Sequence, residues 1–307
     1  MKNKITRILK NPRYALYAAR SRLQLFTSRY RLFALDEQYR SDSENGMYSA
    51  TVTRTLSNQR RFETFKRDPA YQQILEHVSR EQGEEYLKIL RPRADGVLEA
   101  ALRSVLVTDS VGSPVKFIYS GIELRLSPTT LRYVKVASDL KRLFGMSIGS
   151  VAEIGCGYGG QCVVSEKLLG YKRFTLLDLP FVNLLIKRYI DYTLFDGSYR
   201  TATINELEPA AYDLAVSNYA FSELPAPLQR VYIAKVLAMS ARGYLTMNSG
   251  IGGFHEKGKL TLEELRGLLP PFQCLEENPL TAPYNYIIVW GHDASKIDGW
   301  FSLRQFT

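Results

Sequence analysis

The chain has 307 residues, of which 45% are hydrophobic, 12% aromatic and 23% charged. This composition excludes a largely disordered protein, and a chain of this length can bury the core of one large domain or two smaller ones. The three cysteines show no metal-ligand spacing, and their odd number argues against a disulfide framework, which favours a reducing compartment. No apolar run reaches the roughly 18 residues of a spanning helix and no secretory signal is evident, so we expect a cytoplasmic protein.

The positive charge is concentrated at the start of the chain. Residues 1–35 contain nine Lys or Arg and no acid, so they account for the whole formal net charge of +9. Aromatic and aliphatic residues are interleaved with these bases. Such a segment is compatible with an anionic membrane face, nucleic acid, a partner protein, an organelle transit peptide or a solvated arm without a specific role. We rank the membrane above nucleic acid, and expect a basic arm that can hold the protein at the inner face of the membrane.

The region from 36 to 145 carries mainly helical signals. Asp and Ser cap the free N–H groups of a first turn, Pro fits into that turn, and Gly ends a helix. These signals and the apolar stripes between them predict helices from Asp68-Pro69 to Gly83 and from Ser127-Pro128 to Gly145. A short hairpin around Ser120-Gly121 is expected within residues 115–127.

From residue 146 onward, strands and helices alternate, which predicts an α/β domain with a mostly parallel sheet. Strands are expected at 151–155, 174–178, 201–204, 212–218, 243–248, 274–279 and 285–291. Helices are expected at 159–169, from Pro180, at 225–240, and after a capping box formed by Thr261 and Glu264. The last two strands are close enough in sequence to lie antiparallel. The chain is therefore divided into an arm (1–35), a mainly helical region (36–145) and a Rossmann-like domain with a seven-stranded sheet (146–307).

The most informative motif is the glycine-rich segment VAEIGCGYGG at 151–160, which follows the first strand of this domain. Glycines allow a sharp turn and a close approach of the backbone to a ligand, and the following helix N-terminus leaves N–H groups free. Asp178 ends the next strand, where a carboxylate is spaced to accept hydrogen bonds from a ribose diol. The unit therefore predicts a site for a nucleoside cofactor.

The glycines fit two cofactor patterns. Gly155, Gly157 and Gly160 match G-x-G-x-x-G, the pattern of NAD(P)-dependent oxidoreductases. With Glu153 in front, Gly155, Gly157 and Gly159 instead match E-x-G-x-G-x-G, the first motif of S-adenosylmethionine-dependent methyltransferases. About half the chain precedes the motif, and a symmetric dinucleotide domain would need a second crossover of similar size, so the context favours the methyltransferase pattern.

Polar residues after the fourth strand of the domain are the next candidates. Ligands of open parallel sheets bind beyond the carboxyl ends of the strands, at the point where the strand order reverses. Ser217, Asn218 and Glu223 follow the fourth strand, so they are expected near the reactive end of the cofactor. The alternative reading is that Ser and Asn only cap the next helix.

The chain resembles the sugar O-methyltransferase family over roughly residues 125–292. The resemblance rests on SPTTLRYV, EIGCGYGGQ, LLDLP, SNYAFSEL, RGYLTMN and YNYIIVWG. It implies a Rossmann-like methyltransferase fold, S-adenosylmethionine as cofactor and a sugar hydroxyl of a glycan or glycan precursor as acceptor. Matched by position, the implied cofactor contacts are Glu153, Gly155, Gly157, Gly159 and Asp178, with Leu179, Ser217 and Asn218 beside them.

Transfer of a methyl group to a hydroxyl needs alignment and benefits from a base that removes the hydroxyl proton. Glu223 and His255 are the candidates for this base, while His77 and His292 are interpreted as structural. No compact carboxylate cluster suggests a metal site. A nucleic-acid methyltransferase would explain the basic arm, but SNYAF lacks the two prolines common after the fourth strand of enzymes that methylate base amino groups. A non-catalytic binding module is the remaining alternative, and the sugar, its hydroxyl and the oligomeric state stay open.

Overall fold

The computed structural model describes residues 46–104, 106–248, 258–297 and 300. The basic arm over 1–35 and the candidate base His255 therefore lie outside the described residues, and the expectations about them stay predictions. Within the described part of the chain, no helix is long and apolar enough to span a membrane.

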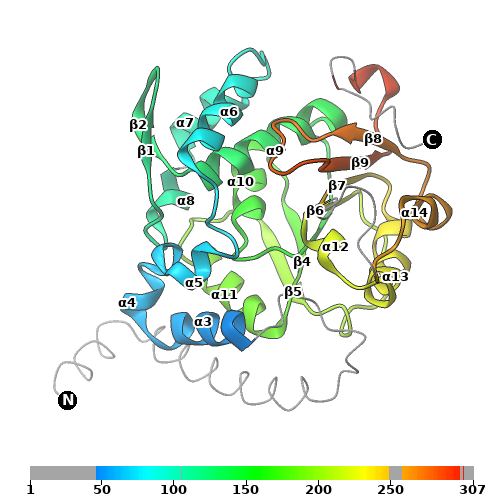
Figure 1. Ribbon diagram of the computed structural model, residues 1–307, viewed down its shortest axis with the longest axis horizontal. Helices are drawn as coiled ribbons and strands as arrows, with labels where there is room; N and C mark the ends of the chain where they lie inside the picture. The colour runs from blue at the N-terminus through cyan, green and yellow to red at the C-terminus, as the bar shows by residue number, and fades with distance from the viewer. Residues whose placement is uncertain (1–45, 105, 249–257, 298–299, 301–307) are drawn as a thin grey trace.

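A seven-stranded sheet forms the centre of the molecule (Figure 1). Its strands in chain order are β3 (Val151–Ile154), β4 (Arg173–Leu177), β5 (Ser198–Ala202), β6 (Leu214–Asn218), β7 (Gly243–Met247), β8 (Gln273–Glu276) and β9 (Tyr286–Trp290). They lie in the order β5-β4-β3-β6-β7-β9-β8. Strand β9 is antiparallel to both of its neighbours, and the other neighbouring pairs are parallel. The strand order reverses between β3 and β6, which fixes the switch point where an open sheet binds its ligand.

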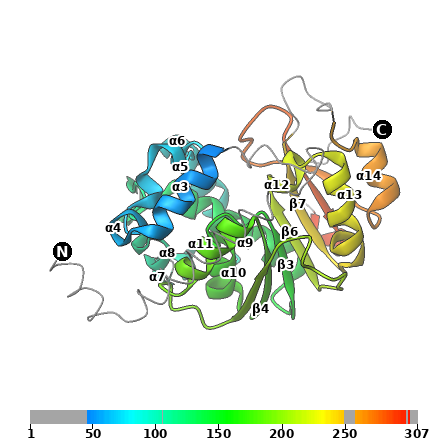
Figure 2. The same cartoon turned by 90° about the horizontal axis from the view of Figure 1, so that it is seen from below.

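Helices cover both faces of this sheet (Figure 2). One face carries α9 (Pro128–Phe144), α10 (Gly160–Leu169) and α11 (Pro180–Ile190), and the other carries α13 (Ala226–Lys235) and α14 (Leu262–Leu268). Successive side chains of a strand point to opposite faces, so both sets must be apolar. In β9, Ile287 and Val289 join the core under α9–α11, whereas Ile288 and Trp290 join the core under α13 and α14. This two-sided burial explains why the strands are apolar runs without polar alternation.

The N-terminal region adds a further layer outside α9–α11, as Figure 2 shows. It contains α3 (Gly46–Ser57), α4 (Gln59–Phe62), a 3₁₀ turn (Phe65–Arg67), α5 (Pro69–Gln72), α6 (Arg80–Leu90), α7 (Val97–Ser104), α8 (Leu106–Ser110) and a hairpin of β1 (Phe117–Tyr119) and β2 (Ile122–Leu126). Helix α6 packs on α9, and α3 packs on α11. One apolar cluster runs from Tyr48 to Val289, so the core is continuous across residue 146. The domain boundary at that residue stays a prediction.

Most elements follow the sequence signals. The helix from Pro128 ends at Gly145, the hairpin turns at Gly121, and the capping box of Thr261 and Glu264 opens α14. The predicted seven strands are all present, with the third shifted to 198–202. The predicted helix over 225–240 is shorter, since α13 ends at Lys235 and a 3₁₀ turn (Leu237–Met239) follows.

The predicted helix from Pro69 to Gly83 is wrong. Helix α5 ends at Gln72, and a new helix begins directly after Ser79. The Ser79 hydroxyl accepts a hydrogen bond from the Gln82 N–H at 3.2 Å, and the Gln82 side chain accepts one from the Ser79 N–H at 2.9 Å. This capping box starts α6 inside the predicted span. Gly83 lies within α6, where a Cβ would meet the Tyr119 hydroxyl oxygen, so this glycine allows close packing and does not end a helix.

Candidate functional site

The glycine-rich loop lies at the carboxyl end of β3. Gly155, Gly157 and Gly159 have φ angles of 69°, 57° and 88°, in the left-handed region that side chains with a Cβ avoid. A Cβ at Gly155 would lie 2.0 Å from the Ala220 Cβ, so the loop contacts the segment after β6 directly. The sequence pattern therefore reflects a conformation and a contact that only glycine permits.

The N-terminal region also contacts this loop. A Cβ at Gly157 would lie 2.7 Å from the Leu75 Cδ1 atom. Tyr158 is buried between Phe65, Tyr133 and Tyr189, with ring centroids 5.7, 6.1 and 4.7 Å away. The loop is thus fixed from one side by the sheet and from the other by helices that the sequence analysis treated as a separate region.

Asp178 is tied to the loop by backbone hydrogen bonds. Its carboxylate accepts one from the Gly157 N–H at 3.0 Å and one from the Leu179 N–H at 2.7 Å. Burial raises the pKa of Asp178 to about 7, although these N–H donors and that of Cys156 lower it. The carboxylate is therefore oriented at the edge between β3 and β4.

Glu153 lies on β3 and is 4% exposed. Burial, followed by the nearby charge of Asp178, raises the pKa of Glu153 to about 8. Two carboxyl groups of elevated pKa therefore lie beside the glycine loop, and strongly perturbed pKa values are typical of functional sites. The structure brings together Glu153, Gly155, Gly157, Gly159, Asp178 and Leu179 at the carboxyl end of β3, and their role as cofactor contacts stays a prediction.

The residues after β6 differ in their roles. The Ser217 hydroxyl donates to the Ile154 carbonyl at 3.0 Å and accepts from the Phe221 N–H at 3.1 Å, so it joins β3 to the turn after β6. Asn218 has a buried Oδ1 atom without a hydrogen-bond partner among the described residues. Tyr219 has a φ angle of 69°, a strained backbone of the kind that concentrates at functional sites. Asn218 thus offers an unused acceptor, whereas the Ser217 hydroxyl is already occupied.

Glu223 ends the short helix α12 (Ala220–Glu223) and belongs to a polar network. It accepts a hydrogen bond from Asn248 Nδ2 at 3.1 Å, and Asn248 Oδ1 accepts one from Asn285 Nδ2 at 3.4 Å. Asn285 donates to the Thr281 hydroxyl at 3.0 Å, which connects the network to Glu277. The network therefore joins residues that follow β6, β7 and β8 at one edge of the sheet.

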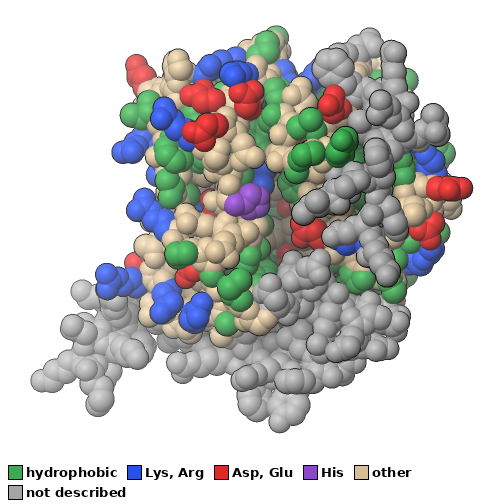
Figure 3. All heavy atoms as spheres, in the orientation of Figure 1, with side chains coloured by type: hydrophobic (Ala, Val, Ile, Leu, Met, Phe, Trp, Pro, Cys, Tyr) green, Lys and Arg blue, Asp and Glu red, His purple; other side chains and the backbone are tan. Residues whose placement is uncertain are grey.

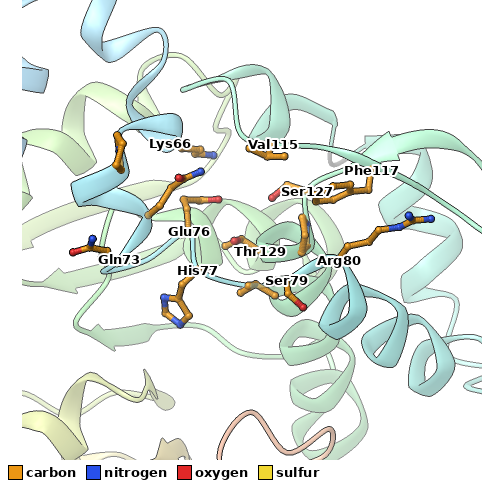
Figure 4. Close-up of a pocket in the computed structure, with 14 residues that line it drawn as sticks. Lys66, Gln73, Glu76, His77, Ser79, Arg80, Val115, Phe117, Ser127 and Thr129 are labelled. Atoms are coloured by element: carbon orange, nitrogen blue, oxygen red, sulfur yellow. The ribbon is translucent and has the colours of Figure 1, made fainter.

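Figure 3 shows that this side of the molecule is hollowed near its centre, with a histidine and acidic side chains beside the hollow. A neighbouring pocket of about 520 Å³ lies between the α5–α6 segment and the start of α9. Figure 4 shows Glu76 pointing into that pocket and His77 pointing away from it. Partial burial of the ring, followed by the positive charge of Arg132, lowers the pKa of His77.

Two further residues belong to this region. His77, which the sequence analysis interpreted as structural, is exposed and is among the residues that line the neighbouring pocket. Arg132 appeared only within the SPTTLRYV segment, although it is a charged residue in a helix that is buried on nearly all sides. A buried position for a charged side chain is visible only in the tertiary structure, so the sequence offered no direct signal. Among the described residues, no group of three His, Cys, Asp or Glu could hold a metal ion.

No protein-family model matches the chain, and no curated protein does. Solved structures are similar to part of the chain. An O-methyltransferase from neocarzinostatin biosynthesis, in complex with S-adenosyl-L-homocysteine and 1,4-dihydroxy-2-naphthoic acid, is 15% identical over 53% of this chain and 57% of its own, with a TM-score of 0.36. The mitomycin 7-O-methyltransferase is 13% identical over 52% of this chain and 56% of its own, with a TM-score of 0.38.

A third match is magnesium protoporphyrin IX methyltransferase from Synechocystis PCC 6803 with bound S-adenosylmethionine, 14% identical over 52% of this chain and 76% of its own, with a TM-score of 0.40. The chain spans less than two thirds of the length of the first two proteins. At these identities and TM-scores the likeness carries no argument about function, so the case for a function must come from the residues of the site.

Proposed function

We propose that this protein is an S-adenosylmethionine-dependent methyltransferase. The observation that carries the proposal is the Asp178 carboxylate, which the Gly157 and Leu179 N–H groups orient at the switch point of the sheet. A carboxylate in this place can accept hydrogen bonds from both hydroxyls of a ribose. The antiparallel strand β9 between β7 and β8 also differs from the all-parallel order of a dinucleotide-binding domain, which argues against a nicotinamide cofactor.

The residues of the site fit S-adenosylmethionine. Asp178 would hold the ribose, the left-handed glycines would let the ligand approach the backbone, and the buried Asn218 Oδ1 atom would accept a hydrogen bond from a donor of the ligand. Glu153 lies behind the loop and adds negative charge near a cationic ligand when it is ionised. When bound, the cofactor supplies a methyl group that is already activated for displacement.

A sugar hydroxyl of a glycan or glycan precursor is the acceptor that we propose. The resemblance of SNYAFSEL and NYIIVWG to sugar O-methyltransferases supports it. So does the polar network of Glu223, Asn248 and Asn285, because amide and carboxylate side chains match the many donors and acceptors of a sugar.

Three residues are candidates for the base that removes the hydroxyl proton. Glu223 and His255 were predicted from the sequence, and His77 joins them because its pKa is lowered, which keeps its imidazole neutral near pH 7. Each can accept a proton as the new bond forms, so the hydroxyl does not have to ionise before attack.

The cofactor assignment is tested by calorimetry on the purified protein. We expect S-adenosylmethionine and S-adenosylhomocysteine to bind, and Asp178→Ala to weaken both by about 1–3 kcal/mol through loss of the ribose hydrogen bonds. NAD and NADP serve as comparison ligands. Tight nicotinamide binding, with no binding of S-adenosylmethionine, would make the protein an oxidoreductase candidate instead.

A further inference from the structure

A buried arginine without a counter-ion lies at the carboxyl end of the sheet. Arg132, on α9, is 8% exposed, and its Nε atom is buried without a hydrogen-bond partner. Within the described residues its guanidinium takes part in no hydrogen bond and no ion pair. Burial of a permanent charge costs free energy unless an anion compensates it. The arginine therefore indicates that a bound ligand supplies the compensating anion.

The neighbours of Arg132 compensate its charge only in part. Its Cζ atom lies 5.6 Å from the ring centroid of Tyr133 and 5.8 Å from that of Tyr219. Such cation–π contacts leave the N–H donors of the guanidinium unused. Glu277 lies on the other side of Tyr219. Its carboxylate already accepts hydrogen bonds from the Tyr219 hydroxyl at 2.5 Å and from the Thr281 N–H at 2.9 Å.

The two rings place Arg132 beside the glycine loop. A Cβ at Gly160 would lie 2.4 Å from the Tyr133 Cε2 atom, and Tyr219 directly follows β6. Strands β4 and β6 flank β3 on opposite sides. Asp178, after β4, and Tyr219, after β6, are therefore separated by two strand spacings, roughly 10 Å. A ligand held by Asp178 and lying across the end of β3 extends toward Arg132.

We propose that Arg132 binds a carboxylate of a bound ligand. This inference rests on the proposed function and names a further subsite of the same site. The planar guanidinium matches a carboxylate through two parallel hydrogen bonds. Two ligands offer such a group: the amino-acid end of the cofactor, and an acidic sugar acceptor. A cofactor with its ribose at Asp178 that lies across the end of β3 would bring its amino-acid end beside Tyr219 and Arg132.

The test compares ligands with and without a carboxylate. S-Adenosylhomocysteine carries the amino-acid end, whereas 5′-methylthioadenosine has the same base and ribose without it. We expect Arg132→Met to weaken S-adenosylhomocysteine by roughly 10- to 100-fold and to leave 5′-methylthioadenosine unchanged. Arg132→Lys should recover part of the loss because it keeps the charge and loses the planar fork. A second arm titrates D-glucuronate and D-glucose into protein saturated with S-adenosylhomocysteine.

Lys135→Met is the matched control. It removes another buried cation from the same helix, but Lys135 is already paired with Asp139 at 2.6 Å. It should lower the melting temperature and leave both affinities unchanged, which separates misfolding from loss of a ligand contact. Circular dichroism of each variant verifies that the fold is retained.

Each outcome decides the proposal. Selective weakening of S-adenosylhomocysteine assigns the carboxylate to the cofactor, and selective loss of glucuronate assigns it to the acceptor. Unchanged affinities in both arms, or equal weakening of S-adenosylhomocysteine and 5′-methylthioadenosine, overturn the proposal. If the native protein binds no S-adenosylhomocysteine, the proposed function fails and the inference with it. If the native protein binds S-adenosylhomocysteine but neither arm depends on Arg132, the inference fails and the proposed function stands.

Discussion

At the scale of single residues, Glu153 and Asp178 link the site to pH. Burial raises the pKa of Glu153 to about 8 and that of Asp178 to about 7, above their ordinary values near 4. Between about pH 4 and pH 8 these two groups therefore bind more protons in the folded protein than in the unfolded chain. The free energy of unfolding contributed by these groups is therefore highest below pH 4 and falls as the pH rises through about 8.

Glu153→Gln is expected to remove part of this dependence. At pH 5 the wild-type carboxyl is protonated and resembles the amide, whereas at pH 9 it carries a buried charge. The variant should therefore gain stability relative to the wild type as the pH rises from 5 to 9. Thermal melts of the ligand-free proteins at several pH values measure the difference. A difference that stays constant across this range would show that Glu153 does not titrate there.

The identity of the base is also a question for single residues. Replacing the true base among Glu223, His77 and His255 by Gln should lower kcat by roughly 100-fold or more and spare cofactor affinity. Methyl transfer from labelled S-adenosylmethionine to a panel of nucleotide sugars measures it. His292→Gln is the control, because His292 lies after β9 and contacts Gln273 at 3.0 Å. Wild-type turnover in all three variants would mean that none of them is the base, and that alignment of the hydroxyl with the methyl group accounts for catalysis.

At the scale of elements, the turn between β3 and α10 depends on its contact with the segment after β6. Gly155→Ala adds a Cβ 2.0 Å from that of Ala220 at a φ of 69°, and we expect a loss of about 2 kcal/mol or more. Gly170→Ala is the control, since its φ is 70° with nothing within 4 Å of the added Cβ, and should cost about 1 kcal/mol.

The double variant Gly155→Ala with Ala220→Gly separates the clash from the backbone strain. Removal of the Ala220 Cβ should recover the steric part of the loss and leave the conformational part. Urea unfolding of the single and double variants gives the coupling free energy directly. If the changes in the free energy of unfolding of the two single variants add up to that of the double variant, the two segments do not clash.

At the scale of the whole molecule, we propose that the arm over 1–35 holds the protein on an anionic membrane face. Each of its nine Lys or Arg can contribute about 1 kcal/mol near such a surface, so partial engagement is enough. Sedimentation with anionic and neutral vesicles should show binding to the anionic ones only. High salt should weaken it and deletion of 1–35 abolish it. Equal binding to both vesicle types, or none, would contradict the membrane role.

Much of the fold was predictable because local signals and tertiary structure agree. Thr261 and Glu264 open α14 because their side chains satisfy backbone N–H groups three residues apart. At the start of α9 the Ser127 side chain makes no capping hydrogen bond, and Pro128 fits the first turn because its φ angle is already helical and it has no N–H to satisfy. The glycine loop and Asp178 were predictable for the same reason, because the contact of Asp178 with Gly157 spans neighbouring strands of one βαβ unit. The span from Pro69 to Gly83 failed where the apolar stripe at helical spacing ran past a competing cap at Ser79.

The sequence by itself determined the order of strands and helices, the glycine-rich motif with its following Asp178 and the concentration of charge in residues 1–35. These depend on periodicity, capping and composition, which are properties of short segments. The tertiary structure alone decided that Leu75 covers the glycine loop and that the Ser217 hydroxyl is occupied. It also decided that, among the residues that the structure describes, Asn218 Oδ1 has no donor and Arg132 has no anion. The physical reason is that burial and hydrogen-bond partners come from residues far apart in the chain, which only packing brings together.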